Sequence, residues 1–373
     1  MPTTGPTVSQ INGQSTQGGE IQFHLVDVND HVIKILNSQP APSLYALFGN
    51  DGLPPEPTIS VGDSVGILIW EAGGNGLFSQ AETFGSIPGT GGMSAGSHPA
   101  TIPDQIVGRD GKISIPFYGM EQAAGLTPFA LQNNIKRHLQ GKAVDPQVLV
   151  NISGSLANAV TIIGDVNHGA LVPLSVHGEK LLDIIAAAGG SSAPDYATYV
   201  KLTRHGITAT VPMIQLVDDP AENIYSWPGD TITLVHHSKV FETFGATTAN
   251  AEIPFNAEQI SLAQALAKSS GLNDLLADPA GVFLIRSEPA SLVDILNGKT
   301  PQFGETGTVP VVYHLDLSNL KSYFLAQQFP VEDKDIVYAA NASSNSVQKF
   351  FILLGTLTNP ILTGVAIKNT TSP

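Results

Sequence analysis

Apolar and polar residues alternate over many short stretches of this chain, which predicts β-strands joined by tight turns. Residues 21–26 alternate in this way and predict a first strand. Residues 59–70 predict a strand, a Gly-Asp turn and a second strand, and residues 107–116 predict a hairpin. The hairpin follows from Asp110-Gly111, because such a pair supplies the positive φ that a two-residue turn needs.

One predicted helix follows these strands and precedes a further strand. Residues 127–139 predict a helix with Thr127 as its N-cap and Pro128 as its first residue. Its apolar stripe recurs at every fourth position, at Leu131, Ile135 and Leu139. Residues 145–152 predict a further strand. Together these elements predict a compact unit over residues 58–155.

The second half of the chain repeats one order of elements, namely strand, helix, strand, turn and strand. The first copy lies within residues 160–235 and the second within residues 240–338. Matching positions are 81 or 82 residues apart, as in the pairs Gly164 and Gly245, Gly190 and Gly271, and Arg204 and Arg286. An insertion near residues 288–312 lengthens the second copy. The repeat predicts two tandem small α+β domains.

A Gly-Asp turn before an apolar strand occurs at Gly62-Asp63 and Gly229-Asp230, and in degenerate form at Lys334-Asp335. Glycine permits the turn, and the aspartate can bond its own backbone two residues further on. We interpret these aspartates as structural residues and not as catalytic ones.

The last apolar stretch, Phe350–Ile367, holds 18 residues without a charge. As a helix it would reach roughly 27 Å, close to the thickness of the hydrocarbon core of a bilayer. One face carries an apolar stripe that we expect to meet lipid, at Leu354, Leu357, Ile361 and Val365. Another face carries polar side chains that we expect to line a water-filled lumen, at Thr356, Asn359 and Thr363. Pro360 lies inside the stretch and is expected to kink it. Periodicity alone leaves a helix packed on the soluble body as an equal alternative.

Charge and composition exclude several classes of function. The formal net charge is −15 and charged residues make up 13% of the chain, which argues against nucleic acid as a partner and against charge-driven docking on anionic lipid. Cysteine is absent, so the chain offers no disulfide and no thiolate. Residues 1–20 lack the apolar run of a signal peptide. We expect a mature form whose export signal has been removed, with Met1 as an added start.

The sequence offers no convincing catalytic, metal or cofactor residue. It lacks a Gly-x-Ser-x-Gly elbow and a His-Glu-x-x-His motif. His236-His237 is a poor chelating pair, because adjacent residues of a strand point to opposite faces. The glycine-rich stretch at residues 73–76 lacks the Gly-Lys-Ser/Thr ending of a phosphate loop. We therefore predict that the protein is not an enzyme and uses no cofactor.

The motifs of residues 58–155, taken in order, resemble those of a known family, the outer-membrane polysaccharide export proteins of the capsule-export type. The resemblance rests on residues 59–65, 69–71, 76–78, 107–116, 124–127 and 145–148. Within them the residues that we interpret as a structural motif are Gly62, Asp63, Trp70, Asp110, Gly111, Pro116 and Gly125. The two repeats resemble the tandem soluble-ligand-binding β-grasp (SLBB) domains of the same family, and residues 338–350 resemble the junction to its C-terminal helix.

The resemblance implies an α+β fold that ends in a transmembrane helix, with copies of the helix forming an α-helical barrel. The implied segments are an extended N-terminal segment (1–57), the export domain (58–155), two SLBB domains (156–238 and 239–341) and an amphipathic membrane helix (342–373). It further implies export of capsular or exopolysaccharide through a homo-oligomeric ring, commonly an octamer, in the outer membrane. A large periplasmic body, an N-terminal lipid anchor in the precursor and an inner-membrane copolymerase, often a tyrosine kinase, as partner are also implied.

Two other functions stay open on the sequence. The first is a monomeric periplasmic module that binds carbohydrate or another ligand through its β-grasp repeats. The second is a periplasmic hydrolase, for which Glu56, Glu71 and Glu82 offer carboxylates of unknown separation.

Overall fold

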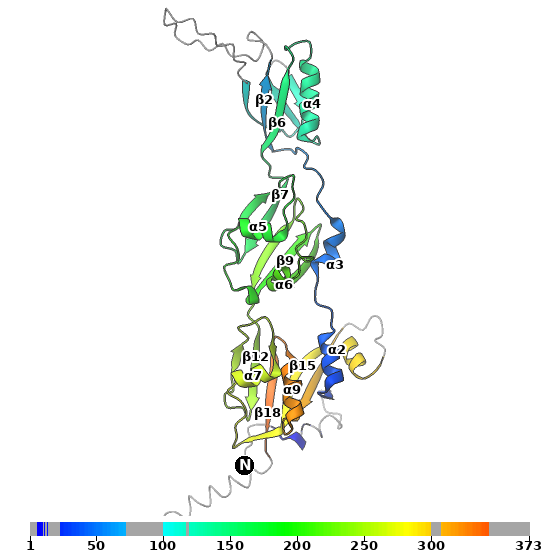
Figure 1. The fold of residues 1–373 in the computed structure, drawn as a ribbon, viewed down its shortest axis with the longest axis vertical. Coiled ribbons are helices and arrows are strands. Elements are labelled where there is room, and N and C mark those ends of the chain that lie inside the picture. Colours follow the sequence, from blue (N-terminus) through cyan, green and yellow to red (C-terminus); the bar gives the residue numbers. More distant parts are fainter. Residues whose placement is uncertain are drawn as a thin grey trace, which may run out of the picture. The chain divides into compact units, whose positions relative to one another are not determined.

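The computed structural model describes residues 6–9, 11, 13, 23–71, 100–116, 119–299 and 307–342. The chain divides into two compact units. One holds residues 42–237, and the other joins residues 1–41 to residues 238–373. Each unit mixes helices with mostly antiparallel strands, so the chain has an α+β fold (Figure 1).

The first part of the unit over residues 42–237 is a small sheet packed against one helix. The sheet has the order β3-β2-β6 and is accompanied by a separate β4-β5 pair. Its elements are β2 (Ser64–Trp70), β3 (Ala100–Ile106), β4 (Lys112–Ile115), β5 (Gly119–Gln122), α4 (Pro128–Leu139) and β6 (Gln147–Gly154). The expected stripe of α4 is fully buried against this sheet, and Thr127 caps the helix as predicted.

The expected hairpin at residues 107–116 forms differently. Asp110-Gly111 makes the tight turn, with Gly111 at a φ of 76° and its backbone N donating to the oxygen of Gly108 at 2.9 Å. One backbone bond spans the turn, from the N of Gly108 to the oxygen of Lys112 at 3.0 Å, but the strand partner of β4 is β5, which follows it in the chain. The segment before the turn is β3, which continues the ladder of β2. The strand predicted within residues 112–115 is confirmed, but its predicted partner is wrong.

The rest of the same unit is the first repeat. Its sheet has the order β10-β9-β11-β7-β8, in which β11 and β7 are parallel. Its elements are β7 (Ala159–Gly164), β8 (Ala170–Pro173), α5 (Leu181–Ala187), η2 (Asp195–Ala197), β9 (Thr198–Arg204), β10 (Ile207–Pro212), α6 (Met213–Asp218) and β11 (Thr231–His236). Helices α5 and α6 bury apolar side chains against one face of this sheet.

The second repeat forms the core of the other unit and follows the same order. Its sheet runs β1-β16-β15-β18-β12-β13, and β12 and β18 are parallel as β7 and β11 are in the first repeat. Its elements are β12 (Val240–Gly245), β13 (Glu252–Pro254), β14 (Ile260–Ser261), α7 (Leu262–Lys268), β15 (Ala277–Pro289), α8 (Ala290–Leu296), β16 (Thr308–Leu315), α9 (Leu320–Gln328), β17 (Pro330–Val331) and β18 (Asp335–Asn341). The structure thus confirms the repeat predicted from the sequence.

The expectation of an extended segment over residues 1–57 is wrong, because the segment contains a strand and two short helices. Strand β1 (His24–Asp27) adds to the second repeat's sheet in parallel with β16, and α2 (Asp30–Asn37) buries its apolar face in that repeat's core. Helix α3 (Leu44–Phe48), followed by η1 (Gly49–Asp51), belongs to the first repeat's core. Asn29 caps α2 and Ser43 caps α3, and both capping residues were overlooked as start signals.

The docking of α2 can be tested by removing one buried side chain. Ile33 is 3% exposed inside the core of the second repeat, whereas Lys34 beside it is exposed. We expect Ile33→Ala to lower the free energy of unfolding by about 2–5 kcal/mol, because the substitution leaves a cavity. Lys34→Ala serves as the matched control and should change it by less than about 0.5 kcal/mol. Urea unfolding measures both values, and equal effects of the two substitutions would contradict this packing.

Candidate functional site

The motif residues of the export domain meet through backbone hydrogen bonds. Ile59 exchanges two bonds with the segment that follows β5, since its N donates to the oxygen of Leu126 and its oxygen accepts from the N of Gly125, both at 2.8 Å. The N of Gly62 donates to the oxygen of Val107 at 2.9 Å. Both glycines have positive φ, 86° at Gly125 and 93° at Gly62. These residues therefore tie three separate loops of the export domain together.

The other motif residues lie around the same small core. The oxygen of Gly111 accepts from the backbone N of both Ala123 and Ala124 at 2.9 Å, which links the Asp110-Gly111 turn to the strand β5 region. Trp70 ends β2 and pairs with Gln147, and Pro116 lies in the turn after β4. In this arrangement the motif residues have roles in turns and strand ends.

The three Gly-Asp turns share one geometry. In each, an aspartate carboxylate that is at most 1% exposed accepts a hydrogen bond from the backbone N of the residue three positions earlier. The pairs and their N–O distances are Asp63 with Ser60 at 2.8 Å, Asp230 with Trp227 at 2.8 Å, and Asp335 with Glu332 at 2.7 Å. Each aspartate thus closes the turn that starts the next strand.

In both repeats the turn aspartate also holds a buried arginine. Arg204 ends β9, and its guanidinium binds Asp230 through Nε at 3.0 Å and Nη2 at 2.7 Å. Nη2 also donates to the oxygen of Tyr225 at 2.7 Å, and Nη1 pairs with Asp51 at 2.9 Å. Burial on its own would lower the pKa of Arg204, but the hydrogen bonds to Asp230 and Asp51 outweigh it and raise the pKa. The fork therefore stays charged and bidentate.

Arg286 of β15 repeats this contact in the second domain. Its Nε and Nη2 donate to Asp335 at 2.7 and 2.6 Å, and Nη2 donates to the oxygen of Pro330 at 2.9 Å. Nη1 adds Glu332 at 3.0 Å and the buried Glu288 at 3.3 Å. Burial opposes the charge of Arg286, yet its bonds and charge pairing with Asp335 raise its pKa above the ordinary value. All of these groups are engaged with one another, so the cluster offers a structural anchor and not a free acid or base.

The predicted membrane residues lie outside the described part of the chain. Leu354, Leu357, Ile361 and Val365 belong to residues 343–373, as do Thr356, Asn359 and Thr363, and Pro360 with them. None of the helices within the described ranges has both the length and the apolar character that a bilayer crossing requires. In those same ranges no group of three or more His, Cys, Asp or Glu side chains is placed to hold a metal ion.

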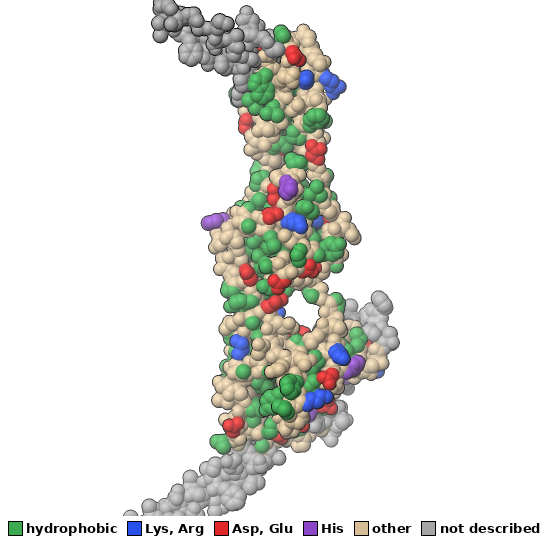
Figure 2. Space-filling view, in the orientation of Figure 1, with side chains coloured by type: hydrophobic (Ala, Val, Ile, Leu, Met, Phe, Trp, Pro, Cys, Tyr) green, Lys and Arg blue, Asp and Glu red, His purple; other side chains and the backbone are tan. Residues whose placement is uncertain are grey.

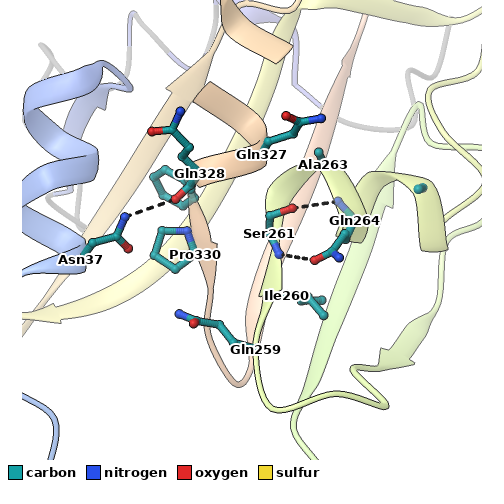
Figure 3. A pocket seen from close by; sticks show the side chains of 11 residues that line it. Asn37, Gln259, Ile260, Ser261, Ala263, Gln264, Gln327, Gln328 and Pro330 are labelled. Carbon is teal, nitrogen blue, oxygen red and sulfur yellow. Dashed lines mark hydrogen bonds between the residues drawn. The ribbon is translucent and has the colours of Figure 1, made fainter. Parts of the chain in front are cut away.

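One surface feature was not anticipated from the sequence. Amide side chains line a hollow of about 680 Å³ on the second repeat, between α7 and the end of α9 (Figure 3). They come from α2, the residue before β14, α7 and α9, at Asn37, Gln259, Gln264, Gln327 and Gln328. These residues are far apart in the sequence and come together only through tertiary contacts. No sequence motif or spacing predicts that they line one hollow.

The anchor role of Asp335 leads to a stability prediction. We expect Asp335→Ala to lower the free energy of unfolding by about 3–5 kcal/mol, because it leaves Arg286 buried without its partner. The control is Lys321→Ala, which breaks an ion pair with Asp30 at 3.3 Å whose side chains are 73% and 62% exposed. That change should cost less than about 1 kcal/mol. Denaturant unfolding distinguishes the two, and a loss at Asp335 as small as at Lys321 would refute the anchor.

The sequence matches two family descriptions and several characterised proteins. Residues 52–153 match "Polysaccharide biosynthesis/export protein", and residues 239–339 match "SLBB domain". Among similar proteins, the capsule polysaccharide export outer membrane protein CtrA of Neisseria meningitidis serogroup B is 34% identical over 381 residues, covering 100% of this chain and 94% of CtrA. The capsule polysaccharide export protein BexD of Haemophilus influenzae is 33% identical, covering 97% of this chain and 92% of BexD.

A more distant relative is named for a different polysaccharide. The Vi polysaccharide export protein VexA/TviF of Salmonella typhi is 26% identical over 78% of this chain and 76% of its own length.

The match to the SLBB description covers the second repeat, and the first repeat has the same order of elements. The chain therefore belongs to the outer-membrane polysaccharide export family and carries an export domain followed by tandem SLBB domains.

Proposed function

We propose that this protein exports a capsular or exopolysaccharide across the outer membrane to the cell surface. The observation that carries the proposal is its similarity to CtrA along its whole length, because the match includes the export domain, both repeats and the tail. The anchors described above support a role in architecture, since their charged groups are tied to one another and not to an open catalytic site. The protein acts as a conduit and performs no chemical step.

The conduit is a homo-oligomeric ring, commonly an octamer in the family that the sequence resembles. Copies of the segment at residues 342–373 cross the outer membrane side by side as an α-helical barrel. The polar face of each helix lines the lumen and the apolar face meets lipid. Neutral hydroxyl and amide groups suit a passing polymer, because they exchange hydrogen bonds without holding an anionic chain.

The remaining parts lie beneath the membrane. The export domain and the SLBB domains form a periplasmic body, and a lipid on the N-terminus of the precursor anchors it to the outer membrane. An inner-membrane polysaccharide copolymerase, of the kind that often carries a tyrosine kinase, delivers the polymer from below. The motif residues Gly62, Asp63, Trp70, Asp110, Gly111, Pro116 and Gly125 keep the export domain in shape for this assembly.

Deleting the gene tests the function directly. We expect the deletion strain to lose surface polysaccharide and to retain the polymer inside the cell, and a plasmid copy of the gene to restore the surface layer. Antibody labelling of intact cells and of lysed cells measures both pools. Normal surface labelling without the gene would refute the proposal. Normal surface labelling in the deletion strain, together with tight glycan binding by the purified protein as a monomer, would instead favour a periplasmic binding module.

Two substitutions test the orientation of the tail. We expect Leu357→Asp to abolish export, because an aspartate facing lipid at mid-membrane costs about 3 kcal/mol per subunit. Thr356→Asp introduces the same charge at the adjacent position, on the lumen face. This variant should still insert and assemble, because water in the lumen solvates the aspartate. Membrane fractionation and detergent gel filtration report insertion and assembly. Equal behaviour of the two variants would contradict the assigned faces.

A further inference from the structure

We propose that the amide-lined hollow on the second SLBB domain is a binding site for a segment of the exported polysaccharide; this inference rests on the proposed function. The hollow lies between the first turn of α7 and the chain that leaves α9 (Figure 3). Asn37 lies on one side and Gln264 on the other, with Pro330 and Ser261 between them. Its volume of about 680 Å³ is within the range of ordinary small-ligand sites.

The lining supplies hydrogen-bonding groups that the protein itself leaves unused. The side chains of Gln259, Gln327 and Gln328 are exposed and make no hydrogen bond with any residue that the structure describes. Gln264 uses Oε1 to accept from the N of Ser261 at 2.9 Å, and its side-chain amide N has no hydrogen-bond partner within the described ranges. A carboxamide offers two donors and an acceptor on one planar group. Sugar hydroxyls donate and accept as well, so neighbouring hydroxyls on one ring can be matched by such groups.

The hollow also has apolar surface of the kind that a sugar ring contacts with its C–H groups. Ala263 is partly exposed in its lining, and Phe329 and Pro330 lie buried beneath the surface there. One turn earlier in α9, Tyr323 and Phe324 are exposed, with 51% and 57% of their surfaces accessible. They precede Gln327 and Gln328 by four residues, so each ring lies one turn from an amide on the same face. Figure 2 shows hydrophobic side chains gathered at the surface over α9. Aromatic faces are negative and attract polarised C–H groups.

Charge makes the hollow unusual for this acidic chain. Aspartate and glutamate number 32 against 17 lysines and arginines, yet the described residues lining the hollow include no charged side chain. A second hollow of about 460 Å³ shares Ile260, Gln264 and Ala267 with the first and adds Asn256 and Lys268. The two form one continuous surface across α7, with a single cation at its end. An anionic or neutral polymer can therefore lie along it without facing carboxylates.

The first repeat has a smaller hollow at the corresponding place on the fold. Lys180 and Tyr225 form a bridge there that corresponds to the pairing of Ser261 with Pro330, at offsets of 81 and 105 residues. The hollow beside that bridge is about 250 Å³ and is lined in part by Tyr45 and Phe48 of α3.

A buried carboxylate fixes α3 in that position. Glu222 is 4% exposed and accepts hydrogen bonds from the hydroxyl of Ser43 and from the backbone N of Leu44 at the start of the helix. Helix α3 therefore lines the smaller hollow of the first repeat, whereas the corresponding hollow of the second repeat is larger and is lined in part by amides, including Asn37 of α2.

Calorimetry on the full-length protein in detergent tests the site. The probe is a set of short oligosaccharides cut from the surface polysaccharide of the host bacterium. The variant combines Gln259→Ala, Gln327→Ala and Gln328→Ala. We expect its Kd to rise at least about tenfold, which is about 1.4 kcal/mol and consistent with losing three modest hydrogen bonds. The matched control combines Gln140→Ala, Gln147→Ala and Asn297→Ala, which are exposed amides elsewhere without described partners, and should leave Kd unchanged.

A second variant reaches the site without removing an amide. Ala267 is exposed and borders both hollows, so Ala267→Tyr should fill them and weaken binding while leaving thermal unfolding unchanged. Wild-type affinity in both variants, or no binding by the unmodified protein, would overturn the inference. The proposed function would survive that result if gene deletion still removed the surface layer. If deletion left the layer intact, the proposed function would fail and the inference with it.

Discussion

The architecture depends on an ion pair between a buried arginine and the aspartate of a turn, which occurs once in each SLBB domain. The pairs Arg204 with Asp230 and Arg286 with Asp335 join β9 or β15 to the start of the neighbouring strand, β11 or β18. The strand that starts at the aspartate is central in its sheet, lying between the antiparallel β9 or β15 and the parallel β7 or β12. Fixing its first residue therefore fixes the register on both sides. Bidentate geometry makes the contact directional, and the desolvated charges make a broken pair costly.

In the export domain, the corresponding turn aspartate is held without an arginine. Asp63 also closes its turn, but its second oxygen accepts from the hydroxyl of Ser155 at 2.8 Å. Backbone bonds from Ile59 and Gly111 to the segment after β5 then complete a small core around Ile59, Ile135 and their neighbours. All three domains therefore place a buried carboxylate at a turn. Its side-chain partner is a serine in the export domain and an arginine in each SLBB domain.

Local patterns predicted the parts of this fold that local physics determines. The cap at Thr127, the stripe of α4 and the order of both repeats follow from spacings of a few residues or from self-similarity, and all are present in the structure. The placing of β1 beside β16, the partner of β4 and the Arg–Asp pairs depend on contacts between distant residues, which no periodicity records. The extended segment predicted before residue 58 instead contains two short capped helices, and each is held by burial against a repeat that lies far away in the sequence.

The candidate sites divide along the same line. The family resemblance of the export motif was predictable, because it rests on the order of short motifs along the chain. The amide hollow was not, since it assembles glutamines from α7 and α9 with an asparagine from the N-terminal segment. In our account the body holds its shape through internal ion pairs, presents an uncharged surface to the polymer and passes it to a membrane barrel formed by the tail.

Self-association into a closed conduit is the central claim, and electron microscopy of full-length particles extracted from outer membranes tests it most directly. The account predicts closed rings with a central channel and a belt of detergent around the tail. Particles that are single copies, with the tail packed against the SLBB domains, would contradict it.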